Sequence, residues 1–106
     1  MFDRSRTVTI NGTIKAVEWT NPHVWIWVTV PATEAHPGVY ALESGGPLQM
    51  QRMGASYAKF KVGDKVGVVL YPIKDGRLGG QPKIYQFADG TTFNVDQAVV
   101  KYASGH

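Results

Sequence analysis

The sequence contains no cysteine among its 106 residues. This absence excludes disulfide bonds, cysteine-ligated zinc and thiol nucleophiles, and it decides nothing about the redox compartment. No apolar run approaches the ~18 residues of a membrane-spanning helix, so no membrane span is predicted. Residues 1–10 also lack the apolar centre of a signal peptide.

The chain also has no large excess of positive or negative charge. The formal net charge is +3, and the 11 Lys and Arg residues are spread along the chain with Asp and Glu among them. A duplex-binding protein typically carries a basic stripe, whereas the nearest approach to one here is Lys59, Lys61 and Lys65. Nucleic acid is therefore a disfavoured partner.

Histidines are few and separated. His23, His36 and His106 are the only three, and no two of them have the spacing of metal ligands on one predicted element. We therefore predict no metal site and no cofactor.

The residues that are present describe an ordinary globular chain, with 43% apolar and 18% charged residues. A chain of this length forms one domain, so residues 1–106 are predicted to be a single domain. Residues 96–106 lack a clear periodicity and are expected to fray.

Alternating apolar side chains predict a protein built from strands. The first predicted strand changes phase near Lys15 and Ala16, which indicates a β-bulge, and Gly12 allows a bend. Residues 72–80 are predicted to form a loop. The expected strands are 7–20, 23–30, about 39–43, 65–71, 83–87 and 91–95.

A short helix is predicted between the third and fourth strands. Pro47 is well placed at its first position and Gly54 at its end. Met50, Met53 and Tyr57 then form an apolar stripe that we expect to face inward. A long bent first strand and a helix in this position are typical of the OB-fold. We therefore predict an all-β, OB-fold-like barrel of five or six strands with one short helix.

The predicted strand at 23–30 has apolar side chains on both faces. Four branched aliphatic residues share one face, which we expect to line the core. The other face carries His23, Trp25, Trp27 and Thr29. Two indoles on an outer face are either covered by more protein, such as the C-terminal segment or a second subunit, or they contact a partner.

The stretch Glu18-Trp19-Thr20-Asn21-Pro22-His23 is the most specific part of a wider pattern. With Leu42-Glu43-Ser44-Gly45-Gly46-Pro47 and Val62-Gly63-Asp64-Lys65-Val66, it resembles DUF6152, a family of uncharacterised bacterial proteins. The resemblance covers about residues 2–93 and implies no activity. It implies an exported protein, periplasmic or secreted, whose signal peptide is cleaved. The chain begins after a His-His-Ser-Phe segment of the pattern, as expected of a trimmed sequence.

Candidate site residues gather around this stretch. Because the second and third strands are expected to pair, Glu43 is predicted to lie near His23, where a Glu–His pair resembles acid–base machinery or orders a loop. Arg52 on the helix is expected to form a salt bridge with Glu43. The predicted ligand-binding residues are Asn21, His23, Trp25, Trp27, Glu43 and Arg52.

These patterns favour an exported, non-catalytic binding module. It would use the aromatic face of the second strand to hold a small aromatic or carbohydrate-like ligand or a protein partner, or to form a homo-oligomer. One alternative is a small enzyme in which His23 is the acid or base and Glu43 orients it. A further alternative is an OB-fold that binds single-stranded nucleic acid.

Overall fold

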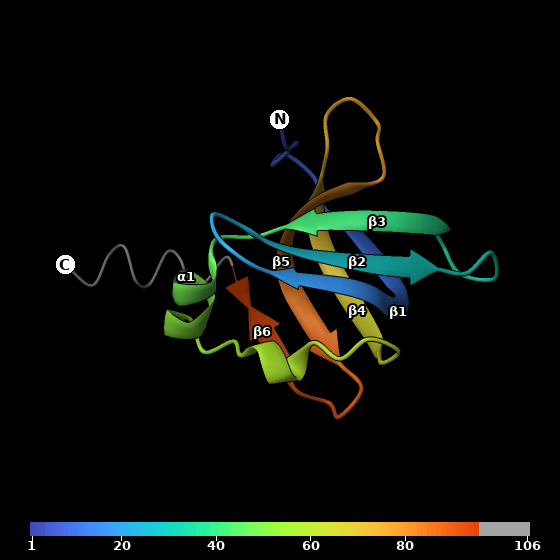
Figure 1. Ribbon diagram of the computed structural model, residues 1–106. Helices are drawn as coiled ribbons and strands as arrows, with labels where there is room; N and C mark the ends of the chain where they lie inside the picture. The colour runs from blue at the N-terminus through green and yellow to red at the C-terminus, as the bar shows by residue number, and fades with distance from the viewer. Residues whose placement is uncertain (96–106) are drawn as a thin grey trace.

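Six β-strands, one α-helix and one 3-10 helix make up the regular structure in a computed structural model, which describes residues 1–95 (Figure 1). The predicted fraying of residues 96–106 lies outside the described residues. The elements are β1 (Val8–Trp19), β2 (Val24–Val30), β3 (Gly38–Glu43), α1 (Pro47–Arg52), η1 (Tyr57–Lys59), β4 (Lys65–Pro72), β5 (Gly79–Phe87) and β6 (Thr92–Asn94).

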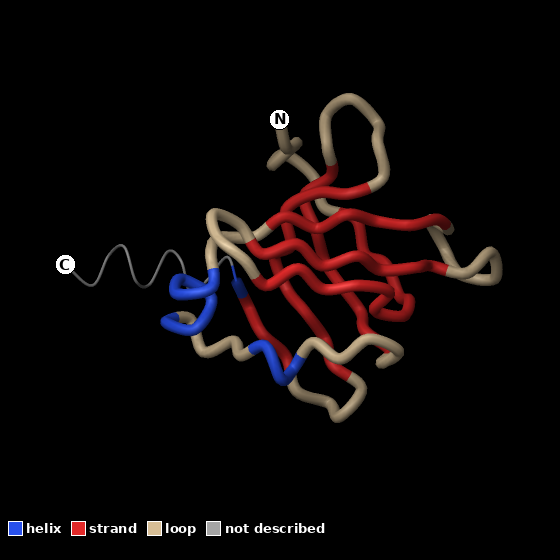
Figure 2. Tube along the Cα trace, in the orientation of Figure 1, coloured by secondary structure: helices blue, strands red, loops and turns tan. Residues whose placement is uncertain are grey.

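The strands form a closed barrel. They pair in the order β3-β2-β1-β4-β5-β6, and a parallel pairing between β3 and β5 closes the first five into a barrel, with β6 added at the edge of β5. In Figure 1, β1, β2 and β3 form the layer nearest the viewer, and β4 and β5 lie behind them. Figure 2 shows how strands dominate the described chain. The prediction of an all-β, OB-fold-like barrel with one short helix is confirmed.

β1 serves both halves of the barrel. Its first half pairs with β4 and its second half with β2, and the register shifts between Ile14 and Ala16. The predicted bulge is therefore confirmed, with Lys15 as the extra residue. A Cβ atom at Gly12 would lie 2.2 Å from the carbonyl oxygen of Thr29, so only glycine lets the end of β2 approach β1 this closely.

α1 begins at Pro47 as predicted, but it ends at Arg52, before two of the three residues of the predicted apolar stripe. Met50 is fully buried and Met53 packs partly buried against the core. The inward position predicted for Tyr57 is wrong, because this side chain is 59% exposed. Gly54 adopts a φ of 95° just after the helix, so Tyr57 falls in η1 and no longer shares a helical face with Met50.

β5 begins earlier than the sequence indicates. The predicted loop at 72–80 and strand at 83–87 are wrong in their bounds, because Gly79 and Gly80 already belong to β5. Gly79 has a φ of 148°, and a Cβ atom on it would lie 2.4 Å from the carbonyl oxygen of Ala41. Glycine, which reads as loop in a sequence, is here the residue that lets β5 touch β3 and close the barrel.

The interior of the barrel is filled mainly by aliphatic side chains. The inward face predicted for β2 is confirmed, since its four branched residues are at most 3% exposed. Phe60 and Tyr85 pack edge to face at the end of the core near η1, with ring centroids 5.0 Å apart. Within residues 1–95, no helix is long and apolar enough to cross a membrane.

Candidate functional site on the outer face of β1, β2 and β3

Trp25 and Trp27 project from β2 to the outside of the barrel. Both are partly exposed, and neither belongs to the hydrophobic core or to the residues packed against it. Their rings are stacked, with centroids 6.0 Å apart and planes inclined by 21°. In Figure 1 this face of β2 looks toward the viewer, and no described helix or loop is drawn across it. We refer to Trp25 and Trp27 as the tryptophan strip.

The neighbours of Trp27 are small. Strand register places Ala16 of β1 on one side of it and Ala41 of β3 on the other. Directly opposed residues on one face of a sheet have Cβ atoms about 5 Å apart, so these positions would otherwise hold side chains against the indole. With only methyl groups at these two positions, neither directly paired residue places a large side chain against the Trp27 ring.

The neighbours of Trp25 are acidic. The same register places Glu18 of β1 and Glu43 of β3 on either side of it. The Glu18 carboxylate accepts a hydrogen bond of 3.4 Å from the hydroxyl of Thr20. Two carboxylates therefore flank one end of the tryptophan strip, whereas alanines flank the other.

His23 lies just before β2, and its imidazole Nδ1 contacts the Glu43 carboxylate Oε2. The backbone fixes this arrangement. The N–H of Val24 donates to the carbonyl of Gly45 at 3.0 Å, and the N–H of Ser44 donates to the carbonyl of Val24 at 2.9 Å. Pairing of β2 with β3 thus brings together His23 and Glu43, which are 20 residues apart in the chain.

Asn21 belongs to the turn that precedes His23. A Cβ atom on Gly46 would lie 3.2 Å from the Asn21 side-chain Oδ1 and 2.9 Å from the Pro22 carbonyl oxygen. The turn therefore lies close over the connection from β3 to α1. Asn21 therefore lies at the edge of the site, in the turn that leads into His23.

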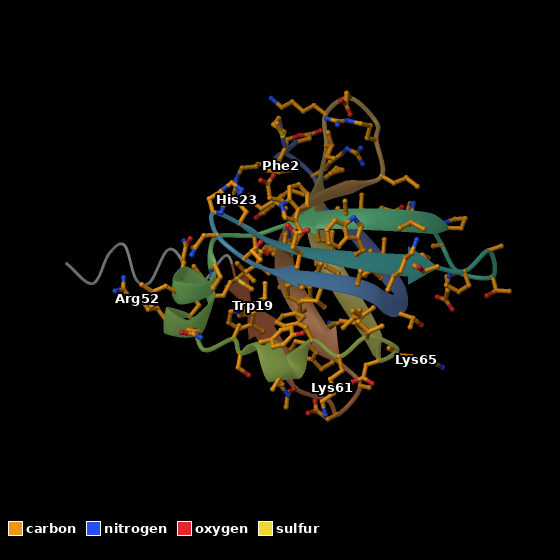
Figure 3. The ribbon with its side chains drawn as sticks, in the orientation of Figure 1. Phe2, Trp19, His23, Arg52, Lys61 and Lys65 are labelled. Carbon is orange, nitrogen blue, oxygen red and sulfur yellow. The ribbon has the colours of Figure 1, made fainter. Side chains whose placement is uncertain are left out.

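A hollow of about 310 Å³ opens beside the His23–Glu43 pair. Its lining combines polar groups with an apolar wall that includes Phe2 and Met53. Figure 3 shows Phe2 and His23 near one another, beside the end of β3. Ser44 lines the same hollow. The His23 imidazole thus faces a space large enough for a small molecule.

Two buried hydroxyl groups near this hollow were not anticipated from the sequence. The Ser44 Oγ and the Tyr85 phenol oxygen are both buried, and the two hydroxyls lie beside one another. Burial raises the pKa of the Tyr85 phenol far above its ordinary value of 10. Alternation in β5 marks Tyr85 as a strand residue, but no local pattern reveals that its hydroxyl is buried beside Ser44.

Arg52 is the one predicted site residue that lies apart. It is exposed in the last turn of α1, and with Leu48 and Met53 it lines a different hollow. Figure 3 shows Arg52 well separated from His23. Glu43 instead has His23 as its charged-group contact. Among residues 1–95, no group of three or more His, Asp or Glu side chains is arranged to hold a metal ion.

The fold and this surface define a small OB-fold-like barrel that carries an outward aromatic strip with an acidic end. The chain belongs to the family of unknown function DUF6152, whose family model matches residues 1–83. The matched range includes the tryptophan strip, both flanking glutamates and His23. No curated protein matches the chain.

Proposed function

We propose that this protein is a non-catalytic binding module whose tryptophan strip contacts a protein partner. One observation carries the proposal: two stacked indoles lie outside the core, on a face of β2 that no described helix or loop covers. Exposed aromatic patches mark interaction sites, and tryptophan is enriched among the residues that dominate binding energy at interfaces.

A protein partner fits this face better than a small ring-shaped ligand does. Small-molecule sites are concave, whereas the tryptophan strip lies on the outer face of a sheet. The hollow beside it is lined by His23 and Glu43 but by neither indole. A small aromatic or carbohydrate-like ligand would use the same rings and is an outcome of the test below. Export to the periplasm or beyond, which the resemblance implied, is part of the proposal and is checked by cell fractionation.

The test is a selection of random displayed peptides on the immobilised protein. Recovered peptides are then titrated against wild type, Trp25→Ala and Trp27→Ala. We expect at least tenfold weaker binding to each variant, as for hot-spot tryptophans. Tyr57→Ala is the matched control, because it removes an aromatic side chain that is 59% exposed elsewhere on the surface.

Circular dichroism and thermal melts establish that each variant is folded. Peptides that bind both tryptophan variants as tightly as wild type contradict the proposal. Failure to recover peptides, together with oligosaccharide binding that depends on Trp25, reassigns the strip to carbohydrate.

A second candidate function is acid–base catalysis at His23. The observation that favours it is the contact between the His23 Nδ1 and the Glu43 carboxylate, at the rim of a hollow. A carboxylate on Nδ1 orients the ring and leaves Nε2 to exchange a proton with a bound molecule. Turnover of a panel of chromogenic esters and glycosides that is lost in His23→Ala and kept in His36→Ala supports this candidate. Equal turnover in all three proteins excludes it for those substrates.

Single-stranded nucleic acid is the least favoured partner. Glu18 and Glu43 lie on either side of Trp25, where a base would stack. Carboxylates repel the phosphate backbone, which dominates nucleic-acid affinity.

A further inference from the structure

The two glutamates beside the tryptophan strip have no Lys or Arg partner within the described residues. Glu18 interacts with the Thr20 hydroxyl, and Glu43 interacts with His23. Three aspartates elsewhere, by contrast, form ion pairs with Lys or Arg within the chain. Those pairs are Asp3 with Arg6, Asp75 with Arg77, and Asp89 with Lys59.

Aromatic rings elsewhere on the barrel carry their own cations. The Arg4 guanidinium lies 4.3 Å from the ring centroid of Tyr71, and the Lys59 ammonium lies 5.0 Å from that of Phe87. No Lys or Arg of the described residues lies over either indole of the tryptophan strip. The chain holds 11 Lys and Arg residues, so a shortage of cations does not explain this difference.

Lys15 is the basic residue nearest to the strip along these strands, and within residues 1–95 it does not pair with either glutamate. Lys15 is the exposed extra residue of the bulge in β1, next to Ala16 and therefore beside the Trp27 end of the strip. It forms no ion pair with Glu18 or Glu43 among the described residues. Arg4 lines the same hollow as Glu43 and His23, but its guanidinium lies over Tyr71 and donates to Gln81, and Glu43 contacts His23.

We infer that the tryptophan strip binds a segment rich in Lys or Arg on a protein partner. An ammonium or guanidinium group of that segment would lie against the Trp25 indole with Glu18 and Glu43 on either side. Tryptophan is the best aromatic partner for a cation, and carboxylates form strong charge-assisted hydrogen bonds with both groups. The inference rests on the proposed function and adds the chemistry of the partner to it.

Three defined peptides test the inference. One alternates Lys with Ser, the second is the same peptide with every Lys acetylated, and the third alternates Glu with Ser. Binding is followed by the NMR signals of the indole N–H groups, assigned by substitution of each tryptophan. We expect the Lys peptide to shift the signals of Trp25 and Trp27, and the acetylated and Glu peptides to leave them unchanged.

Charge-removing variants then separate the inference from the proposed function. The double variant Glu18→Gln with Glu43→Gln is expected to bind the Lys peptide at least tenfold more weakly, and raising the salt from about 0.05 M to about 0.5 M to weaken the wild-type complex. Glu34→Gln is the matched control, because it removes the same charge from the exposed loop after β2. Its affinity should equal that of wild type.

The outcomes are distinct. If the double glutamine variant binds as tightly as wild type while Trp25→Ala does not, the cation inference is overturned and the binding strip stands. If Trp25→Ala and Trp27→Ala change the binding of no peptide, both fail. The glutamine substitutions lie outside the core and preserve side-chain shape, so they test the inference even where a tryptophan variant does not fold.

Discussion

On the side of the barrel formed by β4 and β5, Lys and Arg side chains contact aromatic rings and a carboxylate of the same chain. Arg4 lies over Tyr71, and Lys59 contacts both the Phe87 ring and the Asp89 carboxylate. On the side formed by β1, β2 and β3, the tryptophan strip has no Lys or Arg over it among the described residues, and the adjacent glutamates form no ion pair with one.

The two sides differ in whether their aromatic rings and carboxylates contact a Lys or Arg of the same chain. Cation–aromatic contacts and ion pairs at the β4–β5 side hold the loop after β5 against η1. On the opposite side, the contacts within residues 1–95 are the stacking of Trp25 on Trp27, the Glu18–Thr20 hydrogen bond and the His23–Glu43 pair, and none of them involves a Lys or Arg. A surface that keeps two indoles and two carboxylates without such contacts is suited to intermolecular recognition.

The largest expected effect compares the two faces of β2. Ile26→Ala should lower the free energy of unfolding by about 3 kcal/mol, because it leaves a cavity in a fully buried site. Trp27→Ala removes a larger side chain but should cost only about 1 kcal/mol, because the ring lies outside the core. Urea denaturation of both variants measures the contrast. Equal losses would show that the indole supports the fold.

The next effect concerns the closure that joins the two sides. Gly79→Ala should destabilise the protein by about 3 kcal/mol, since it adds a Cβ atom 2.4 Å from the Ala41 carbonyl oxygen at a φ of 148°. Gly76→Ala is the control: its φ is also positive, but a Cβ atom there meets nothing within 4 Å, so a loss of about 1 kcal/mol is expected. Thermal and urea unfolding measure both variants, and similar losses in Gly79→Ala and Gly76→Ala would argue against a tight β3–β5 contact.

The smallest effect is a pH dependence confined to the β4–β5 side. Thr91 hydrogen bonds and then Lys59 hold the pKa of Asp89 well below its ordinary 3.8. Because the folded pKa is lowered, this carboxylate stabilises the fold above pH 3.8, and the contribution is lost as the pH falls toward the folded value. Asp89→Asn should therefore melt slightly lower than wild type at pH 7, and the difference should be smaller at pH 2.

Glu18→Gln supplies the counterpart from the opposite side. The Glu18 carboxylate of the wild type has only the long Thr20 hydrogen bond. The melting temperature of Glu18→Gln should therefore match that of wild type at both pH values. A pH-dependent loss in Glu18→Gln as large as that in Asp89→Asn would remove the distinction between the two sides.

Much of the fold could be predicted because its signals are local. Alternation in β2 and the phase change near Lys15 each reflect side-chain packing over a few residues. The bounds of β5 and the position of Tyr57 could not be predicted in this way. Gly79 joins a strand only because Ala41, far away in the sequence, lies opposite it, and Gly54 ends the helical register that would have turned Tyr57 inward.

The site was predictable in part for the same reason. Contact of His23 with Glu43 followed from the expected pairing of two strands, and the outward direction of the indoles followed from alternation. The flanking of Trp25 by Glu18 depends on the exact register across a bulge, which no pattern within one strand contains. The burial of the Ser44 and Tyr85 hydroxyls beside one another depends on three-dimensional packing alone.

The extra residue in β1 has a consequence for the whole alignment of the barrel. Were Lys15 paired regularly, every later side chain of β1 would reverse direction, so that Glu18 would enter the apolar interior and Trp19 would face water. An unpaired charge in such surroundings is prohibitively costly. The bulge at Lys15 thus excludes the register in which Glu18 points inward. The packing that keeps the barrel folded therefore also keeps Glu18 on the outside.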